Sequence, residues 1–115
     1  MANIYLNSKK DLTTTNTTRL YTVPNNSRSI VKSILVSSDN AAATTVTVDL
    51  FEGDPAASAA KFTLFNAKAV AANASEQLLT EPLIMLENEV LEVTAADANR
   101  LFVVVSILEI NREDR

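Results

Sequence analysis

The feature of this sequence that most constrains its fold is the alternation of aliphatic and polar residues in short segments. The alternation is clearest over residues 44–51, where Val46, Val48 and Leu50 are each separated by one polar residue. A period of two is typical of a β-strand that buries one face and exposes the other. The segment is therefore predicted to be a half-buried strand with its aliphatic side chains in the core.

Four other segments have the composition of β-strands, because Val, Ile, Leu and Thr predominate in them. They are residues 19–23, 30–36, 89–94 and 101–110. The last of these segments is apolar on both faces, so we expect it to be covered twice or to contact a neighbour. Its two apolar sets are Phe102, Val104, Leu108 and Ile110 on one face and Leu101, Val103, Val105 and Ile107 on the other.

Asparagine and aspartate are predicted to form the turns between these segments, because the chain of 115 residues contains a single glycine, Gly53. Asn and Asp tolerate positive φ better than other non-glycine residues. They recur at intervals of about 10 to 20 residues, which suits a series of short antiparallel strands. The expected turn residues are Asn25, Asn26, Asp39, Asn40, Asn73, Asn88, Asp97 and Asn99.

The alanine-rich stretch at residues 54–79 is predicted to contain at most a short helical turn, followed by two strands. Asp54 followed by Pro55 is typical of a helix N-cap with proline at the first helical position. Residues 62–65 fall in an alternating segment, so we expect one strand there and a second at residues 76–79.

Together these segments predict one all-β domain over residues 19–110, an antiparallel β-sandwich of seven or eight strands with a jelly-roll-like or immunoglobulin-like topology. Residues 1–18 are expected to be a polar N-terminal loop, or an arm that orders on a partner, and the loop is the preferred interpretation. Leu12 is the only large apolar residue between residues 7 and 18. Residues 111–115 are expected to form a charged C-terminal tail.

Two clusters of carboxylates are candidate sites: the first is Asp49, Glu52 and Asp54, and the second is Glu87, Glu89 and Glu92. Oxygen ligands this close could hold Ca²⁺, but the spacing of the first cluster does not match an EF-hand loop. Glycosidase carboxylates normally lie beside aromatic platforms, and the chain contains no Trp. Both clusters are interpreted as solvent-facing turns or strand ends.

The residue types that are missing argue against most catalytic chemistry. The chain contains no Cys and no His, which removes the usual ligands of zinc and haem, the thiol nucleophile and the imidazole base. A single glycine cannot form a glycine-rich phosphate loop. We therefore expect a protein that is not an enzyme, with no catalytic, cofactor-binding or metal-binding residues.

Charge and hydropathy argue against two kinds of partner. The net charge is -4, and the ten basic residues do not form the stripe that nucleic-acid binding requires. No apolar run approaches the roughly 20 residues that span a bilayer, and the first ten residues lack the pattern of a secretory signal. We expect neither nucleic acid nor a membrane as a partner, and synthesis in a cytoplasm.

Several motifs of this chain consist of a strand, a turn and a second strand. Residues 20–38 read LYTVPNNSRSIVKSILVSS and are followed by an Ala- and Thr-rich turn and a TVTV strand. Later, EPLIML at residues 81–86 and NEVLEV at residues 88–93 form a P-L-x-L segment, a turn and an x-L-x-V segment. These motifs resemble those of small virion structural proteins of tailed bacteriophages, and the resemblance covers most of residues 19–110.

The resemblance implies a non-enzymatic virion protein, made in the host bacterial cytoplasm, most closely a capsid decoration (cement) protein. It would be a homo-oligomer, with a trimer expected, and would bind the major capsid protein or other virion proteins. A neck or tail component is the alternative in the same setting, and a carbohydrate-binding module is a rival of another class. The residues expected to contact neighbouring subunits are Leu12, Leu101, Val103, Val105 and Ile107.

Overall fold

A computed structural model describes residues 2–111 of the chain, and these residues form nine β-strands and one 3-10 helix of a single turn. No helix in residues 2–111 is long and apolar enough to cross a membrane. The strands are β1 (Ala2–Leu12), β2 (Thr18–Thr22), β3 (Ser27–Ser38), β4 (Thr44–Phe51), β5 (Lys61–Val70), β6 (Ser75–Gln77), β7 (Leu83–Met85), β8 (Val90–Ala95) and β9 (Leu101–Asn111), and the helix is η1 (Pro55–Ala57).

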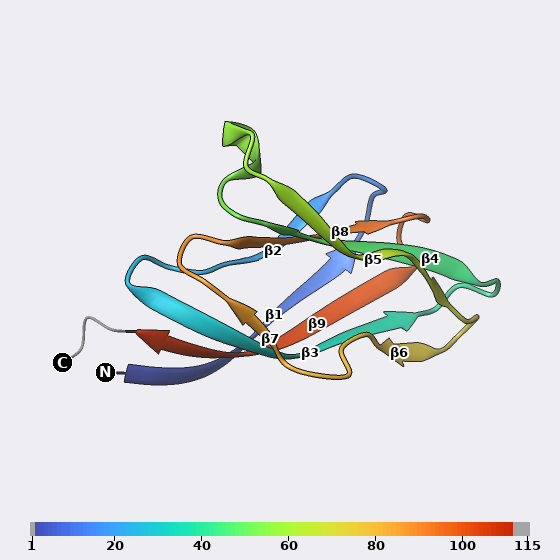
Figure 1. Cartoon of the computed structure of the whole chain (residues 1–115). Coiled ribbons are helices and arrows are strands. Elements are labelled where there is room, and N and C mark those ends of the chain that lie inside the picture. Colours follow the sequence, from blue (N-terminus) through green and yellow to red (C-terminus); the bar gives the residue numbers. More distant parts are fainter. Residues whose placement is uncertain (1, 112–115) are drawn as a thin grey trace.

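The strands form two antiparallel sheets that pack face to face (Figure 1). Sheet A has the order β1-β9-β3, and both β6 and β7 pair with the far side of β3. Sheet B has the order β2-β8-β4-β5. The pairing is nested, since β1 pairs with β9, β2 with β8, β3 with β6 and β7, and β4 with β5. A long hairpin wound in this way into two sheets is a jelly roll.

This strand order decides between the two topologies that the sequence leaves open. In an immunoglobulin-like sandwich, the first two strands of the chain lie side by side in one sheet, whereas β1 and β2 lie in different sheets here. β6 and β7 pair with β3 at different levels and act as one interrupted edge strand. The prediction of an all-β antiparallel sandwich is confirmed, and its topology is the jelly roll.

The predicted strands correspond to β2, β3, β4, β8 and β9. The Ala-rich stretch also contains the predicted elements, since the Asp54 carboxylate accepts a hydrogen bond from the Ala56 backbone N–H at 2.9 Å and caps η1. The strand expected at residues 62–65 lies within the longer β5. The one expected at residues 76–79 overlaps β6, which begins one residue earlier and ends two residues earlier.

The expectation of a loop or arm over residues 1–18 is wrong for the part that forms β1. This strand pairs with β9 along its whole length, from Ala2 opposite Asn111 to Leu12 opposite Leu101. An edge strand needs only one partly apolar face, and the backbone hydrogen bonds to β9 supply the rest of its order. Only residues 13–17 connect β1 to β2. Of the expected C-terminal tail, Asn111 is the last residue of β9, and residues 112–115 lie outside the described residues.

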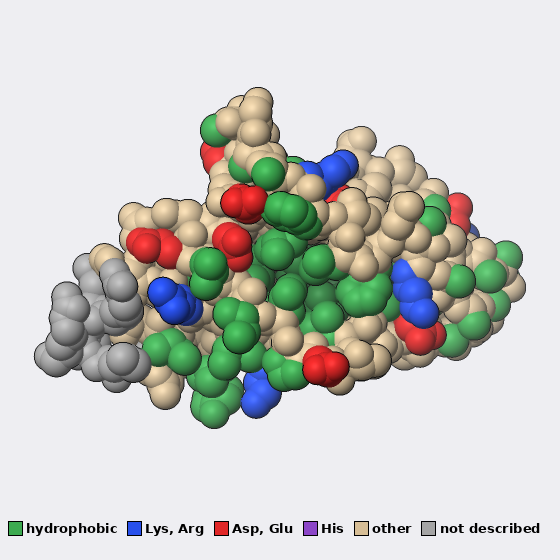
Figure 2. Space-filling model, in the orientation of Figure 1, with side chains coloured by type: hydrophobic (Ala, Val, Ile, Leu, Met, Phe, Trp, Pro, Cys, Tyr) green, Lys and Arg blue, Asp and Glu red, His purple; other side chains and the backbone are tan. Residues whose placement is uncertain are grey.

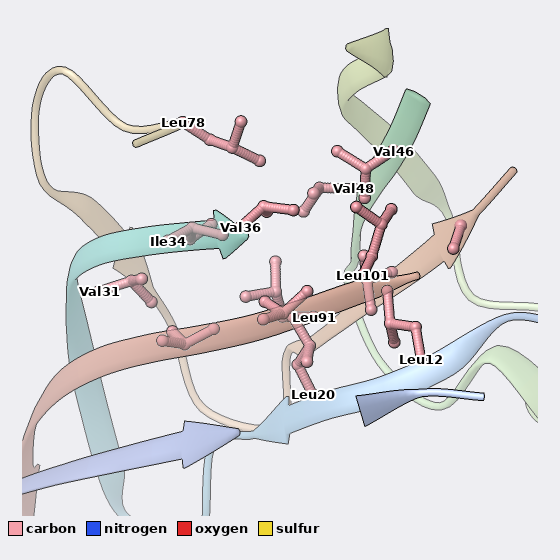
Figure 3. Packing of buried hydrophobic residues seen from close by; sticks show 14 of the residues in the cluster. Leu12, Leu20, Val31, Ile34, Val36, Val46, Val48, Leu78, Leu91 and Leu101 are labelled. Atoms are coloured by element: carbon pink, nitrogen blue, oxygen red, sulfur yellow. The ribbon is translucent and has the colours of Figure 1, made fainter. Parts of the chain in front are cut away.

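The core lies between the two sheets and consists almost entirely of aliphatic side chains, with valine the commonest (Figure 3). In β4, Val46 and Val48 are completely buried, as the alternation predicts. The buried cluster contains Leu12, Leu20, Val23, Val31, Ile34, Val36, Val46, Val48, Val70, Leu78, Met85, Leu91, Val93, Ala95, Leu101, Val103, Val105 and Ile107.

Asparagine takes the left-handed backbone conformation at several of the turns where the sequence predicts it. Asn26, Asn73, Asn88 and Asn99 have φ between 52° and 66°. Gly53, in contrast, does not have a positive φ. The turns of this jelly roll therefore depend on asparagine and not on glycine.

Candidate interaction surface

A row of apolar side chains crosses the outer face of sheet A, the face that points away from the core. Tyr5 of β1 lies opposite Leu108 of β9, which lies opposite Ile30 of β3, which in turn lies opposite Ile84 of β7. Side chains that are directly opposite on neighbouring strands are in contact range. Tyr5 is 75% exposed and Ile84 is 64% exposed, while the two central residues are half-buried. We refer to these four residues as the apolar row.

Further apolar residues extend this face toward the other end of the strands. Val104 of β9 lies opposite Leu35 of β3, and Phe102 follows on the same side of β9. Leu35 and Phe102 are each 38% exposed. An antiparallel sheet with one face in water normally alternates apolar and polar residues, so an apolar outer face on sheet A is unusual.

The outer face of sheet B has the opposite character. Asp49 of β4 lies opposite Glu92 of β8, which lies opposite Arg19 of β2, and Thr63 of β5 completes this polar line. The Thr63 hydroxyl donates a hydrogen bond to Asp49 Oδ1 at 2.7 Å, and Arg19 Nε lies 3.5 Å from Glu92 Oε2. The two outer faces of the sandwich are therefore chemically different, and only that of sheet A carries a broad apolar surface.

Sheet A also carries two shallow depressions, each of about 290 Å³. The first lies where the small Ser106 side chain leaves space, and its lining includes Tyr5, Asn7 and Lys32. The second is lined by Lys9, Lys10, Asp11, Phe102, Val103 and Val104. The apolar row is thus bordered by two shallow depressions whose linings include lysine side chains.

Basic residues predominate among the charged side chains of this face. Lys9 and Arg28 occupy outward positions of β1 and β3, and Lys32 lines the first depression, whereas Asp11 is the acidic residue at an outward position of β1. The chain as a whole has a net charge of -4. The face of sheet A is therefore more basic than the protein that carries it.

Hydrophobic side chains are also visible from the side of the sandwich (Figure 2). In that view they extend from the region around β7 into the space between the two sheets. Phe62 of β5 is 50% exposed, and Leu64 and Leu83 pack against the core as partly buried residues. The opening between β5 and the β6–β7 edge is thus closed by side chains and not by a further strand.

The structure corrects the prediction of the subunit-contact residues, because all five lie inside the core at 1% exposure or less. These residues are Leu12, Leu101, Val103, Val105 and Ile107. The prediction chose the wrong face of β9, since a strand that is apolar on both sides does not itself show which side is inward. The outward set is Phe102, Val104, Leu108 and Ile110, and it was missed together with Tyr5, Ile30 and Ile84.

One sequence signal could have identified the outward face of β9. Ser106 interrupts the outward set, whereas the inward set from Leu101 to Ile107 contains no polar residue. A polar residue is costly inside a core unless it is hydrogen-bonded. The uninterrupted set is therefore the one that should be assigned to the core.

The first acidic cluster is dispersed into separate structural contacts, and the expectation that it faces solvent is wrong for Asp49, which is 7% exposed. Asp49 accepts the hydrogen bond from Thr63 on the outer face of sheet B, and Asp54 caps η1 and lies 3.4 Å from Arg19 Nη2. In residues 2–111, no group of three or more Asp or Glu side chains is placed to hold a metal ion.

Two members of the second acidic cluster organise the turn that carries the chain from sheet A to sheet B, whereas Glu92 lies in β8 beside Arg19 and is buried, not solvent-facing as expected. Glu87 Oε2 accepts a hydrogen bond from the Asn26 backbone N–H at 2.7 Å. Glu89 Oε1 accepts one from the Leu86 backbone N–H, also at 2.7 Å. These carboxylates satisfy backbone donors at a chain reversal, which is a structural role.

A hydroxyl–carboxylate network connects the two sheets near one end of the sandwich. The Tyr21 hydroxyl donates a hydrogen bond to Glu109 Oε2 at 2.6 Å and lies 2.6 Å from Ser29 Oγ. Burial raises the pKa of the Tyr21 hydroxyl well above its usual range, and the hydrogen bond to Glu109 and its negative charge raise the pKa further. Tyr21 is therefore a neutral hydrogen-bond donor that links β2 to β9 and β3.

Comparison with known proteins finds no family model that matches this chain and no curated protein that matches it. Among solved structures, the C-terminal family 22 carbohydrate binding module of Clostridium thermocellum Xyn10B is similar, with 19% identity and a TM-score of 0.42 over 83% of this chain. A chain of infectious bursal disease virus, Gt strain, has 11% identity and a TM-score of 0.48 over 100% of this chain.

This protein spans 62% of the length of the first of these chains and 32% of the second. Both likenesses extend to the β-sandwich fold only. The resemblance of the strand motifs to tailed-phage virion proteins finds no support in these comparisons.

Proposed function

We propose that this chain is a non-enzymatic structural protein of a tailed-phage particle, and specifically a decoration protein of the capsid. The observation that carries the proposal is the apolar outer face of sheet A, which reaches across all its strand positions from Tyr5 to Ile84. Monomeric proteins rarely expose a broad contiguous apolar surface, and such a surface marks a contact with another molecule.

The charges around the apolar row favour a different protein as the partner on this face. Lys9, Arg28 and Lys32 would be brought toward one another if two copies stacked face to face, and like charges oppose association. A shell protein with an apolar patch and an acidic border would be complementary. The major capsid protein is the proposed partner, with the virion as the location of the complex.

The strength of this contact would come from its repetition. Burial of apolar surface contributes about 25 cal/mol per Å², and a patch on one small domain gives only a modest affinity after the costs of association. A homo-oligomer, with a trimer as the proposed state, presents the face several times and gains affinity through effective concentration. A neck or tail component would use the same face in fewer copies.

The experiment that tests the proposal is quantitative mass spectrometry of intact particles from the lysate that contains this protein. A decoration protein should be present in a copy number comparable to that of the shell subunits, whereas a neck or tail protein should be present in a few copies. Absence from purified particles would contradict both.

A matched pair of variants connects the result to the apolar row. Ile84→Asp places a charge in the apolar row, and Ala69→Asp places the same charge at an exposed position on the outer face of sheet B. Ile84→Asp should reduce rebinding to stripped particles at least tenfold, and Ala69→Asp should bind as the unchanged chain does. Equal binding by both variants would show that sheet A is not the contact.

The depression beside Tyr5 supports a second candidate, a carbohydrate-binding module. An exposed aromatic ring next to the side chains of Asn7 and Lys32 offers a stacking surface and hydrogen-bond donors of the kind that bind sugars. A glycan array should then show binding that Tyr5→Ala abolishes. No glycan binding, together with recovery of the chain in particles, would exclude this candidate.

A further inference from the structure

Three of the four sheet edges carry features that oppose pairing with another strand. β5 has two irregularities in its register with β4, and Ala67 at one of them has a φ of 50°. β2 has only five residues and an irregularity between Arg19 and Tyr21. β6 and β7 have three residues each, and the segment between them contains Pro82. Bulges, short strands and proline are the usual means by which edges avoid adding a strand.

The fourth edge, β1, lacks these features. It has eleven residues, no proline, and an unbroken register with β9. Its C-terminal half is protected, because Ser8 Oγ donates a hydrogen bond to the Leu20 backbone oxygen of β2 and the next three residues, Lys9, Lys10 and Asp11, are charged. Long, flat, uncharged edges are templates for pairing.

The N-terminal half of β1 is open. Residues 3–7 contain no charged side chain, and Ile4 and Tyr5 are 47% and 75% exposed on opposite faces of the strand. Among the described residues, no strand pairs with the outer edge of this segment. Its backbone N–H and C=O groups on that side are available to another strand.

We propose that residues 3–7 of β1 pair antiparallel with the same residues of a second copy, so that sheet A continues across a two-fold axis. A two-fold axis perpendicular to the sheet keeps every side chain on its own face, so the numbers of two paired residues must have an even sum. The sum that we propose is 10, which pairs Tyr5 with Tyr5, Ile4 with Leu6, and Asn3 with Asn7.

This register is the one that best matches side chains across the contact. The Tyr5 pair joins the apolar rows of the two copies, and aromatic pairs stabilise antiparallel strands. Ile4 covers Leu6, which is only partly buried in the single chain. A sum of 8 would instead oppose Asn3 to Tyr5, and a sum of 12 would place Lys9 opposite Asn3 and overlap the part that β2 protects.

The inference goes beyond the proposed function, since this contact requires no particle. It is isologous and by itself produces a dimer. If the proposed trimer forms through another surface, the β1 contact joins two trimers. Loss of the β1 contact therefore halves the number of chains in the assembly, from two to one or from six to three.

Single cysteines test the register directly, because the chain contains no Cys of its own. Tyr5→Cys should form a disulfide-linked dimer under mild oxidation, since directly opposed residues are within reach of one another. Asn3→Cys should not link to itself, because the two copies of residue 3 would lie about 13 Å apart along the strands. An equimolar mixture of Asn3→Cys and Asn7→Cys should link. Linkage of Asn3→Cys alone, or none with Tyr5→Cys, would overturn the register.

Charge variants test the contact without oxidation. Tyr5→Lys and Tyr5→Glu should each halve the mass measured by light scattering, and mixing them should restore it, because opposite charges then face one another. Phe62→Lys is the control, because it lies on the irregular edge strand β5, and it should leave the mass unchanged. Circular dichroism confirms that each variant is folded.

The outcomes also separate this inference from the proposed function. If the unmodified chain and Tyr5→Lys have the same assembly mass by light scattering at every concentration, the β1 contact is overturned. This holds even if the unmodified chain is found in particles. A chain that dimerises through Tyr5 but is absent from particles would contradict the proposed function alone.

Discussion

At the scale of single residues, the turns of this jelly roll show how a chain with one glycine forms left-handed backbone. Six non-glycine residues in the described part of the chain have positive φ, and four of them are asparagines. Asparagine tolerates this conformation because its short polar side chain can hydrogen-bond locally. Ala67 has no such compensation, and its φ of 50° is therefore a local strain within β5.

Ala67→Gly should relieve this strain and raise the free energy of unfolding by up to about 1 kcal/mol. The matched control is Ala69→Gly in the same strand, where φ is not positive and glycine should cost about 0.5 to 1 kcal/mol. Urea denaturation of the two variants measures both changes. If both lower stability equally, residue 67 is not strained.

The Tyr21 hydroxyl has a predictable dependence on pH. Its pKa in the folded state is raised above the value of about 10 for an unfolded chain, because of burial first and the contact with Glu109 second. A raised pKa means that the stabilising contribution is complete below pH 10 and is lost as the pH rises beyond it. The unmodified chain should therefore lose more stability above pH 10 than Tyr21→Phe, which cannot ionise.

At neutral pH, Tyr21→Phe should itself lower the free energy of unfolding by about 1 to 3 kcal/mol, since it removes the hydroxyl that donates to Glu109 and is the hydrogen-bond partner of Ser29. Thermal unfolding followed by circular dichroism from pH 7 to pH 11 measures both effects. Parallel curves for the two proteins would show that Tyr21 does not titrate differently on folding.

At the scale of elements, β9 shows how far a sequence pattern can be used. Its existence and bounds follow from the aliphatic run over residues 101–110. Its inward face does not, because both faces are apolar and the choice depends on β3 and β1, which lie far away in sequence. The prediction of five contact residues failed at this point, and the expectation that a doubly apolar strand is covered twice or contacts a neighbour stays a prediction.

β1 and the full length of β5 could not be predicted for a related reason. Six of the eleven residues of β1 are Asn, Ser, Lys or Asp, and its order comes from pairing with β9, about 100 residues later in the chain. β5 continues through a bulge at Ala67 that interrupts its alternation. Local patterns therefore predicted the strands that bury alternate aliphatic residues, and missed strands that depend on distant partners.

Neighbouring residues of β9 provide a direct test of its two faces. Ile107→Ala should lower the free energy of unfolding by about 2 to 5 kcal/mol, because Ile107 is 1% exposed in the core. Leu108→Ala, one residue later on the half-buried outer face, should cost about 1.5 kcal/mol or less. Urea denaturation measures both. A larger loss for Leu108→Ala would reverse the assignment of the faces.

At the scale of the whole molecule, the nested pairing makes β1 the strand that closes sheet A. It covers the edge of β9 and contributes Leu12, which is 1% exposed in the core. A flexible arm would have neither role. The distinction matters for function, because an arm can be removed without loss of fold, whereas a closing strand cannot.

Deletion of residues 2–12 should therefore abolish cooperative thermal unfolding. Loss of Leu12 alone removes about 2 to 5 kcal/mol, and the deletion also exposes the backbone of β9 along eleven residues. A domain has a total stability of about 5 to 15 kcal/mol, so these losses together are comparable to the whole. A circular permutant that joins the two ends with a short flexible linker and opens at residues 13–17 keeps every strand, and it should unfold cooperatively. A deletion variant that melts within a few degrees of the permutant would show that β1 is an appendage and not part of the jelly roll.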